Sequence, residues 1–321
     1  MERDKALDTS RPQHSWLKTT KKLFDAPYFL LPLAPLFWSG NFILGRFVRS
    51  TLPPIGLAFW RWLVASLLII AFAWPYLKKD CELILKNWKI IFLLAILGVA
   101  TFNALAYLGL RYTTAINGVL MQSVIPVIIV IMTFLFFRET IRKIQALGIC
   151  LSLSGVFVIV TQGVPATFLS LSFNIGDLMI LIAVICYAAY SALLQKRPPI
   201  HQLSFLVVTF VIGTVILLPF YLWEHFTIQA MPFNRNAVLS IAYVAVFPSI
   251  LAYFCFNRGV ELIGANKAGL FIHLMPVFGS IMAVFFLGER FRVFHALGIF
   301  LILTGIGLAT RKKTNQKGAK P

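Results

Sequence analysis

Ten long apolar runs constrain this chain more than any other feature of its sequence. Each run is close to the twenty or so residues that an α-helix needs to cross the hydrocarbon core of a bilayer. The runs cover residues 28–48, 54–76, 89–110, 114–136, 144–162, 175–195, 203–223, 237–257, 267–287 and 293–310. The strands of a membrane β-barrel would alternate apolar and polar residues, so unbroken runs predict helices. We therefore expect an all-α integral membrane protein with ten transmembrane helices.

The composition agrees with a membrane protein and excludes other classes. Of the 321 residues, 59% are hydrophobic and 12% are charged, whereas a soluble domain has about 45–50% apolar and about 25% charged residues. The same proportions exclude a disordered chain and a small secreted domain held by disulfides. The four cysteines show no CxxC spacing, so we interpret them as packing residues and expect neither a metal site nor a cofactor.

The basic residues are better explained by membrane topology than by a nucleic-acid partner. The net charge of +18 comes from 29 Lys and Arg against 11 Asp and Glu, a surplus that would suggest nucleic-acid binding in a soluble protein. If the N-terminus is cytoplasmic, 22 of the 29 basic residues fall on cytoplasmic segments, as the positive-inside rule requires. We therefore expect no nucleic-acid partner, both termini in the cytoplasm, and basic tails at 1–27 and 311–321 that could contact lipid headgroups.

An internal repeat divides the chain into two halves. Shifted by 150 residues, segment 126–155 aligns with segment 276–305, and 14 of 30 positions are identical. Each half, 28–162 and 175–310, then contains five apolar runs. Because five is odd, the second copy must enter the membrane from the opposite face, which predicts two inverted five-helix repeats. This plan is common in secondary transporters that bind substrate near the membrane midplane between the halves. Ten helices suffice for a monomer, and a homodimer is the alternative.

Several motifs resemble those of a known transporter family. They are PLFWSGNFILGRF (35–47), LAFWRWLVASLLI (57–69), NALAYLGLRYTTAINGVLMQSVIPV (103–127) and the FRE and GER segments that each lead to ALGI. In this order, over about residues 30–310, they resemble the EamA repeat of the drug/metabolite transporter superfamily. The usual Gly-Ser order after the tryptophan of the first span is Ser39-Gly40 in this chain.

The resemblance implies ten spans in two inverted bundles in the inner (plasma) membrane of a bacterium. Members of the family typically export amino acids or other metabolites, and related proteins import nucleotide-like metabolites or move sugars linked to nucleotides. We therefore expect a secondary transporter that works by alternating access and exports amino acids or related small metabolites. Import or exchange of a nucleotide-like metabolite is the first alternative, and an intramembrane enzyme is the second.

Polar and aromatic residues inside the apolar runs are the candidates for substrate binding. A polar group at membrane depth is costly, so it usually faces a cavity or another helix, and residues at i, i+3 and i+4 share a helix face. Such a cavity would suit a small zwitterion or an aromatic metabolite, and the alternative for each residue is a hydrogen bond between helices. The candidates are Trp38, Asn41, Asn103, Tyr107, Asn117, Gln122, Tyr187, Tyr190, Ser191, Tyr253 and Asn257.

Two ionisable residues and two prolines within the runs complete the set. Arg61 lies about 10 Å into the second run at 1.5 Å per residue, where it could attract a substrate carboxylate or phosphate, or instead snorkel to the surface or pair with backbone oxygens. His273 could bind substrate, carry a proton or simply pack. Pro126 and Pro276 occupy corresponding repeat positions and each removes a backbone donor, so they could form a paired hinge, a ligand contact or a stable kink.

Motifs of enzymes, pumps and channels are missing from the sequence. It contains no HExxH, GxSxG, Asp-rich metal motif or P-loop, so we expect no catalytic residues. The charged rings and carbonyl filters of channels are not visible either. No Asp or Glu lies in the middle of a run, which argues against a proton relay built on carboxylates. Glu139, Glu289 and Asp177 lie at run ends, where we expect helix capping and pairing with Arg142 or Arg292.

Overall fold

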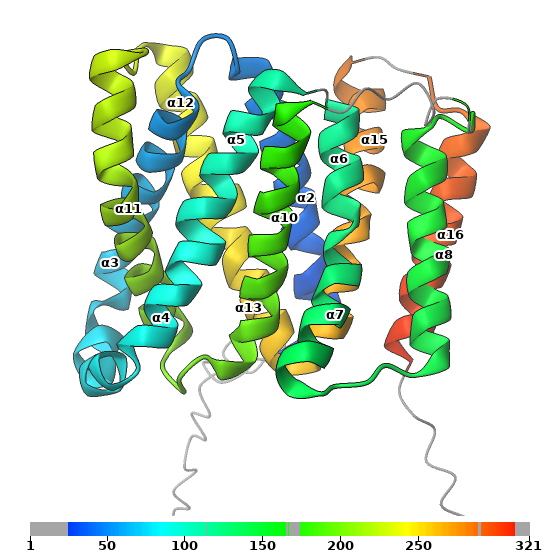
Figure 1. Cartoon of the computed structure of the whole chain (residues 1–321), viewed down its shortest axis with the longest axis horizontal. Coiled ribbons are helices and arrows are strands. Elements are labelled where there is room, and N and C mark those ends of the chain that lie inside the picture. The colour runs from blue at the N-terminus through cyan, green and yellow to red at the C-terminus, as the bar shows by residue number, and fades with distance from the viewer. Residues whose placement is uncertain (1–24, 114, 165, 167–173, 288–289, 312–321) are drawn as a thin grey trace, which may run out of the picture.

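The computed structural model describes residues 25–113, 115–164, 166, 174–287 and 290–311. Across these ranges the regular secondary structure is helical throughout. The helices stand side by side, and the first helix begins at the same end of the bundle at which the last one finishes (Figure 1). We call this end the terminal face and the opposite end the distal face.

The helices follow the predicted runs closely. The first half contains α2 (Pro27–Val48), α3 (Pro54–Lys86), α4 (Trp88–Leu94), the π-helical turn η1 (Ala95–Thr101), α5 (Phe102–Tyr112), α6 (Ala115–Ser123), α7 (Ile125–Phe137) and α8 (Lys143–Val160). The second half contains α10 (Ile175–Leu193), η2 (Leu194–Lys196), α11 (Gln202–Thr227), α12 (Arg235–Val244), the π-helical turn η3 (Ala245–Leu251), α13 (Ala252–Ile263), α14 (Ala265–Gly269), η4 (Leu270–His273), α15 (Leu274–Leu287) and α16 (Val293–Thr310).

Nine helical stretches in the described ranges are long and apolar enough to cross a membrane. The predicted run 267–287 is helical as well, but it is divided into α14, η4 and α15, of which α15 is the longest with 14 residues. Helix α3 has 33 residues and continues beyond residue 76, where the second apolar run ends. Segment 77–86 is rich in Leu and Lys, which favour helix. The end of an apolar run therefore marks the membrane border and not the end of the helix.

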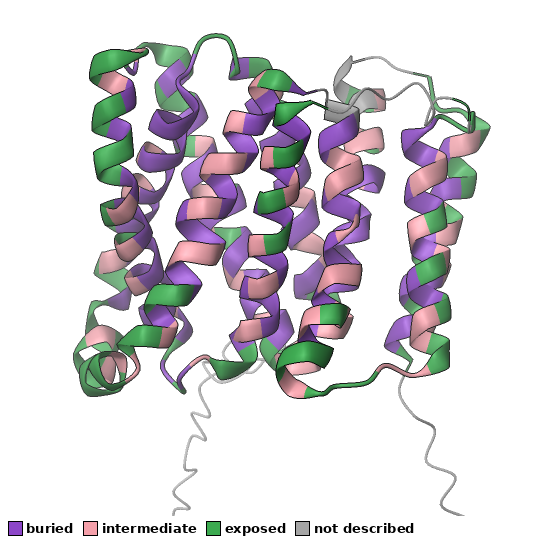
Figure 2. Cartoon of the chain, viewed as in Figure 1, coloured by how far each residue is buried: buried purple, intermediate pink, exposed green. Residues whose placement is uncertain are grey.

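Large apolar side chains cover the outside of the bundle. Phe72, Phe226 and Phe285 are 71%, 79% and 80% exposed. Figure 2 shows the buried residues gathered where helices face one another and the exposed residues on the outer sides and at the two ends. A soluble protein rarely exposes an apolar surface of this extent. The chain is therefore a multi-pass membrane protein whose outer surface contacts lipid.

Two predicted spans are interrupted next to Pro126 and Pro276, which occupy corresponding positions in the two repeats. Helix α6 ends at Ser123 and α7 begins at Ile125, so Pro126 lies in the first turn of α7. Pro276 lies near the start of α15, directly after the 3₁₀ turn η4. Proline is tolerated in a first helical turn because its missing N–H has no partner there. Both prolines thus follow a break in the helix, as expected for a kink or a hinge.

The helix contacts in the two halves correspond to each other. Helix α10 packs against α5 and α7, and its counterpart α2 packs against their counterparts α13 and α15. Helix α3 packs on its own counterpart α11, and α8 packs on its counterpart α16. If every helix is replaced by its counterpart from the other half, the same set of contacts is therefore obtained.

Four glycines form the seam between α8 and α16. A Cβ atom on Gly148 would contact the carbonyl oxygen of Gly305, and a Cβ atom on Gly155 would contact the carbonyl oxygen of Gly298. Gly148 corresponds to Gly298 under the shift of 150 residues, and Gly155 corresponds to Gly305. The two contacts are thus equivalent, and only residues without a side chain allow the backbones to approach this closely.

Candidate functional site

Arg61 of α3 lies at the centre of the bundle with only 1% of its surface exposed. Its Nε donates a hydrogen bond to Oγ of Ser249 at 2.5 Å, and its Nη2 donates to the carbonyl oxygen of Pro248 at 2.9 Å. Its Nη1 lies 2.7 Å from Oδ1 of Asn103 and 2.9 Å from the hydroxyl of Tyr107. The guanidinium is therefore held inside the protein by both halves of the chain, and it does not reach the surface.

The side chains around Arg61 also bond to one another. Tyr107 donates to Oδ1 of Asn41 at 2.6 Å, and the same oxygen lies 3.4 Å from Nη1 of Arg61. Nδ2 of Asn103 donates to the hydroxyl of Tyr253 at 3.3 Å. These bonds connect α2, α3, α5 and α13. We call Arg61, Asn41, Asn103 and Tyr107 the Arg61 cluster.

Two π-helical turns supply backbone acceptors from opposite halves. The turns η1 and η3 begin 150 residues apart. In η1 the carbonyl oxygen of Gly98 accepts a hydrogen bond from Tyr253. In η3 the carbonyl oxygen of Pro248 accepts from Arg61 and, at 3.2 Å, from Nε1 of Trp38. A π-helical turn displaces carbonyls from the regular helical bonding pattern, which leaves these two oxygens available to side chains.

Aromatic rings enclose the Arg61 cluster. The ring of Tyr187 lies 5.5 Å from that of Trp38 and 6.3 Å from that of Tyr253, in both cases edge to face. The guanidinium of Arg61 lies 4.7 Å from the ring centre of Trp62, within the range of a cation–π interaction. All four rings are buried. The charged group is therefore surrounded by amides, phenols and aromatic faces.

A cavity of about 10 Å³ lies beside the cluster, which is room for about one water molecule. Its lining includes the amides of Asn41, Asn103 and Gln122 and the ring of Tyr187. Nε2 of Gln122 and the hydroxyl of Tyr187 are buried and have no hydrogen-bond partner among the described residues. Buried polar atoms normally have a partner, so two groups at this cavity are left to bind something else.

A much larger cavity of about 620 Å³, which we call the vestibule, lies at the distal face between α2, α6, α8, α15 and α16. Its lining includes Arg46 near the end of α2 and Arg290 and Arg292 ahead of α16. Phe42 and Met275 line both the vestibule and the small cavity. These two side chains therefore separate the Arg61 cluster from the vestibule.

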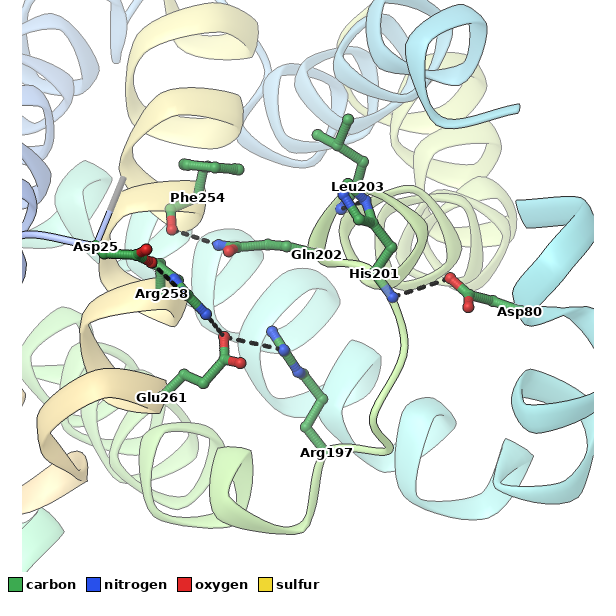
Figure 3. A network of polar contacts seen from close by, with 9 residues as sticks. All are labelled: Asp25, Asp80, Arg197, His201, Gln202, Leu203, Phe254, Arg258 and Glu261. Carbon is green, nitrogen blue, oxygen red and sulfur yellow. Dashed lines mark hydrogen bonds and ion pairs between the residues drawn. The ribbon is translucent and has the colours of Figure 1, made fainter. Parts of the chain in front are cut away.

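The terminal face carries a chain of ion pairs (Figure 3). Glu261 pairs with Arg258 at 2.9 Å and with Arg197 at 3.1 Å, and Arg258 also pairs with Asp25. We call these four residues the terminal network. It joins the start of α2, the end of α13 and the segment that precedes α11. The terminal network therefore holds three segments together at this face through side chains that can separate without breaking a helix.

Glu139 strengthens the same face but not in the predicted way. Its Oε2 accepts hydrogen bonds from Nδ2 of Asn266 at 3.1 Å and from Nε2 of Gln195 at 3.3 Å. Arg142 instead donates to the carbonyl oxygen of Arg311 at 2.6 Å. The prediction that Glu139 pairs with Arg142 is wrong, because the carboxylate is drawn to amides of the second half.

Carboxylates at other helix ends act as caps. Asp177 caps α10 as predicted, with Oδ2 accepting from the backbone nitrogen of Asn174 at 2.8 Å. Glu224, which the sequence did not single out, accepts from the backbone nitrogen of Gly56 at 2.7 Å at the start of α3. A carboxylate is stabilised there by the positive end of the helix dipole. Glu289 and its predicted ion pair lie outside the described residues.

The remaining candidates differ in their distance from the cluster. Tyr190 donates to Oδ1 of Asn257 at 2.9 Å, and its ring contacts that of Tyr187. Ser191 donates to the carbonyl oxygen of Tyr187 within its own helix at 2.8 Å. Asn117 is buried near the start of α6, away from Gln122 at the other end of that helix.

His273 is fully buried at the break ahead of α15. Its Nδ1 lies 2.6 Å from Oγ of Ser152 on α8, and its Nε2 lies 2.8 Å from the carbonyl oxygen of Ser123. Because a carbonyl can only accept, Nε2 carries the proton and Nδ1 accepts from Ser152. His273 thus ties the breaks next to Pro126 and Pro276 to α8.

The sequence analysis did not single out Pro248, Ser249 or Gly98. Pro248 interrupts the eighth apolar run, and only the structure shows that it takes the same place in η3 that Gly98 takes in η1. A proline inside a span frees the carbonyl four residues earlier, which is that of Val244, and this carbonyl accepts from Oγ of Ser249 at 2.6 Å. Within the described residues no three His, Cys, Asp or Glu lie close enough together to hold a metal ion.

Comparison with known proteins gives consistent matches along most of the chain. The profile of the EamA-like transporter family matches residues 26–161 and 174–311. The chain is 32% identical over 284 residues to the Bacillus subtilis "Uncharacterized transporter YyaM", covering 87% of this chain and 92% of that protein. It is 29% identical over 288 residues to an "Uncharacterized transporter" of Archaeoglobus fulgidus, covering 89% of this chain and 98% of that protein.

Two further matches concern location and fold. The chain is 28% identical over 284 residues to the "Uncharacterized inner membrane transporter YicL" of Salmonella typhimurium, covering 85% of this chain and 91% of that protein. A solved crystal structure has the same fold, with a TM-score of 0.72 and 17% identity, covering 88% of this chain and 96% of that chain.

Proposed function

This chain belongs to the EamA-like transporter family, and on that basis we propose that it is a secondary transporter that exports amino acids or related small metabolites by alternating access. It is a multi-pass membrane protein and a transporter, not an enzyme. We place its substrate site at the Arg61 cluster, beneath the vestibule.

The difference between the two faces of the bundle carries this proposal. At the distal face the vestibule of about 620 Å³ reaches down to Phe42 and Met275. At the terminal face the ion pairs of the terminal network hold three segments together, and we take them to close the path on that side. A carrier must expose one site alternately to its two faces, and a conformation open toward one face and closed at the other is one half of that cycle.

Two inverted halves would allow the other half of the cycle. The reciprocal helix contacts, the seam of four glycines and the two π-helical turns support an arrangement in which 28–162 and 175–310 are related by a two-fold axis in the membrane plane. In that case the breaks next to Pro126 and Pro276 are equivalent joints. Closing one and opening the other would reverse the two faces.

The orientation follows from the basic residues. With both tails in the cytoplasm, as the positive-inside rule favours, the vestibule faces outward and the terminal network faces the cytoplasm. Such an outward-facing state would release an exported substrate. The similarity to an inner membrane transporter supports a place in the plasma membrane, with a monomer or a homodimer as the working unit.

Import or exchange of a nucleotide-like metabolite is the second candidate. Arg46, Arg290 and Arg292 give the vestibule a positive lining, which would attract a phosphate group as readily as a carboxylate. The two candidates differ in substrate and not in the path that it takes.

Reconstitution into liposomes tests the proposal. Purified protein is screened for thermal stabilisation by amino acids and by nucleotides, and labelled forms of the stabilising compounds are then used in counterflow. We expect saturable counterflow with amino acids or related metabolites. Flux that rises linearly with concentration would identify a channel, and saturable flux of nucleotides alone would favour the second candidate.

A further inference from the structure

We infer that the Arg61 cluster recognises its substrate through a carboxylate and makes no specific contact with an amino group. This inference rests on the proposed function, since it assumes that the substrate binds beneath the vestibule. It is carried by the charges and hydrogen bonds of the site.

Arg61 has no acidic partner among the described residues. Each hydrogen-bond acceptor of its guanidinium among the described residues is neutral: a hydroxyl, an amide oxygen or a carbonyl. The acidic side chains of Glu224 and Glu261 are committed elsewhere, Glu224 to the start of α3 and Glu261 to the terminal network. An ion at membrane depth is costly unless it is paired. An anionic ligand would supply the missing countercharge.

The unpartnered groups at the small cavity are also donors. Gln122 and Tyr187 are 3% and 1% exposed, and both line this cavity. The amide nitrogen of Gln122 and the hydroxyl of Tyr187 have no hydrogen-bond partner in the described protein. A carboxylate has two oxygens that only accept. It would therefore satisfy both donors, and the cation close behind them would strengthen its binding.

The route from the cavity to the guanidinium passes through two amides. Asn41 and Asn103 line the cavity and at the same time accept from Nη1 of Arg61. If either amide rotates, an entering carboxylate can take its place as acceptor. The planar fork of an arginine suits the two oxygens of such a group.

An ammonium group finds no ionic partner at the small cavity. Its charge-assisted partners are carboxylates, and none of the described carboxylates lines this cavity. The carbonyls of Gly98 and Pro248 already accept from Tyr253, Arg61 and Trp38. The positive lining of the vestibule repels a cation further. The site therefore distinguishes acids from amines.

Two matched series of compounds test the inference. The aromatic series is L-phenylalanine, 3-phenylpropanoate and phenethylamine; the aliphatic series is L-leucine, 4-methylpentanoate and 3-methylbutylamine. Within each series the second compound lacks the amino group and the third lacks the carboxylate. Binding to the full-length protein is measured by thermal stabilisation and by inhibition of counterflow.

We expect the acids in at least one series to bind as tightly as the amino acid or more tightly, and the amines to bind at least tenfold more weakly, as expected for the loss of a charge-assisted hydrogen bond. Binding of an amine as tight as that of the matched acid overturns the inference. Failure of every acid to bind also overturns it. The transporter proposal is tested separately. It stands if any metabolite shows saturable counterflow, whatever the result for acids and amines, and it fails if no metabolite does.

Two variants locate the effect. Arg61→Gln should abolish the preference for acids over amines. Because Arg61→Gln can lower stability, Tyr187→Phe provides a milder change that removes a hydroxyl without a partner, and it should weaken acid binding severalfold. Tyr221→Phe, on α11 at the distal side, is the matched control and should bind like the wild type. Equal acid binding by Tyr187→Phe, Arg61→Gln and the wild type contradicts the inference.

Discussion

Gly98 and Pro248 occupy corresponding positions in two π-helical turns, and each offers its carbonyl oxygen to a side chain that belongs to the other half. Gly98 accepts from Tyr253, and Pro248 accepts from Arg61 and Trp38. The two halves are thus bonded to each other through a pair of equivalent irregularities at membrane depth. Any movement of one half against the other must break or exchange these bonds, which lie beside the proposed substrate site.

Loss of side chains from the site should lower transport without preventing membrane insertion. Asn103→Ala and Tyr107→Ala each remove an acceptor from Arg61, and Tyr190→Ala removes the donor to Asn257. A hydrogen bond to a charged group contributes about 1.5–3 kcal/mol, so we expect the flux of Asn103→Ala and Tyr107→Ala to fall by roughly tenfold or more. Flux is measured in proteoliposomes at equal protein levels. Unchanged flux in all three variants would contradict the site.

The glycine seam should be intolerant of a single methyl group. A Cβ atom on Gly148 or on Gly305 would lie 2.5 Å from the carbonyl oxygen of the other residue. Gly148→Ala and Gly305→Ala should therefore destabilise the protein by about 1–3 kcal/mol, as overpacking does. Gly307→Ala lies on the same helix α16 with open space around it, so it should be neutral or slightly stabilising. Thermal unfolding in detergent compares the three, and equal melting temperatures would refute close packing at the seam.

Glu261→Gln should loosen the terminal face. The change removes the carboxylate that pairs with Arg197 and Arg258. Because these side chains are partly exposed, global stability should change by less than about 1 kcal/mol. The readout is the native Cys255, which is buried one turn before Arg258. In a background without the other cysteines, Cys255 should react faster with a maleimide in Glu261→Gln than in the protein that keeps Glu261. Glu82→Gln removes an equal charge from an exposed position and should leave the rate unchanged. Equal labelling rates of Cys255 in Glu261→Gln and Glu82→Gln would argue against a role of the terminal network in closing this face.

The segment before α11 should lose stability in acid because of His201. Its Nδ1 accepts from the backbone nitrogen of Leu203 at 3.3 Å, and its ring stacks on Tyr76. Burial lowers the pKa of His201 below its ordinary 6.5, Asp80 opposes this shift and Arg197 adds to it. A lowered pKa means that the folded protein favours the neutral ring. Its contribution is therefore complete above pH 6.5 and is lost as the pH falls toward the lowered pKa.

His201→Asn separates this effect from that of the other histidines. Asparagine can cap α11 but does not titrate in this range. Below pH 6.5 the melting temperature of the wild type should fall more steeply than that of the variant. Parallel curves between pH 8 and pH 5 would show that His201 does not contribute.

Much of the fold could be predicted from the sequence because the bilayer imposes simple rules. Run length predicts a span, and nine of the ten runs are helices long enough to cross. The break in the run 267–287 was harder to predict. Pro276 marks its position, but the 3₁₀ turn ahead of it depends on His273 and its bonds to Ser152 and Ser123. Those partners lie far away in the sequence.

The candidate site could be predicted only in part, because it too depends on partners that lie far apart in the sequence. A costly buried charge at Arg61 and polar groups such as Asn103 and Tyr107 stand out in any apolar run. Their partners are harder to see: Pro248 marks a place in the eighth run, but the roles of its carbonyl and of the Ser249 hydroxyl become visible only when the spans are packed together. Glu261 and Arg197 could not be paired either, since charges at span ends are ordinary and only the fold brings those two ends together.

The most direct test of the account is counterflow in proteoliposomes that contain the wild type, Arg61→Gln or Tyr221→Phe at equal amounts. Liposomes are loaded with an unlabelled amino-acid mixture and diluted into a trace of the labelled mixture. The account predicts a saturable overshoot of label for the wild type and for Tyr221→Phe, and its loss in correctly folded Arg61→Gln. An equal overshoot in all three proteins, or no more label than in protein-free liposomes, would contradict a carrier built around Arg61.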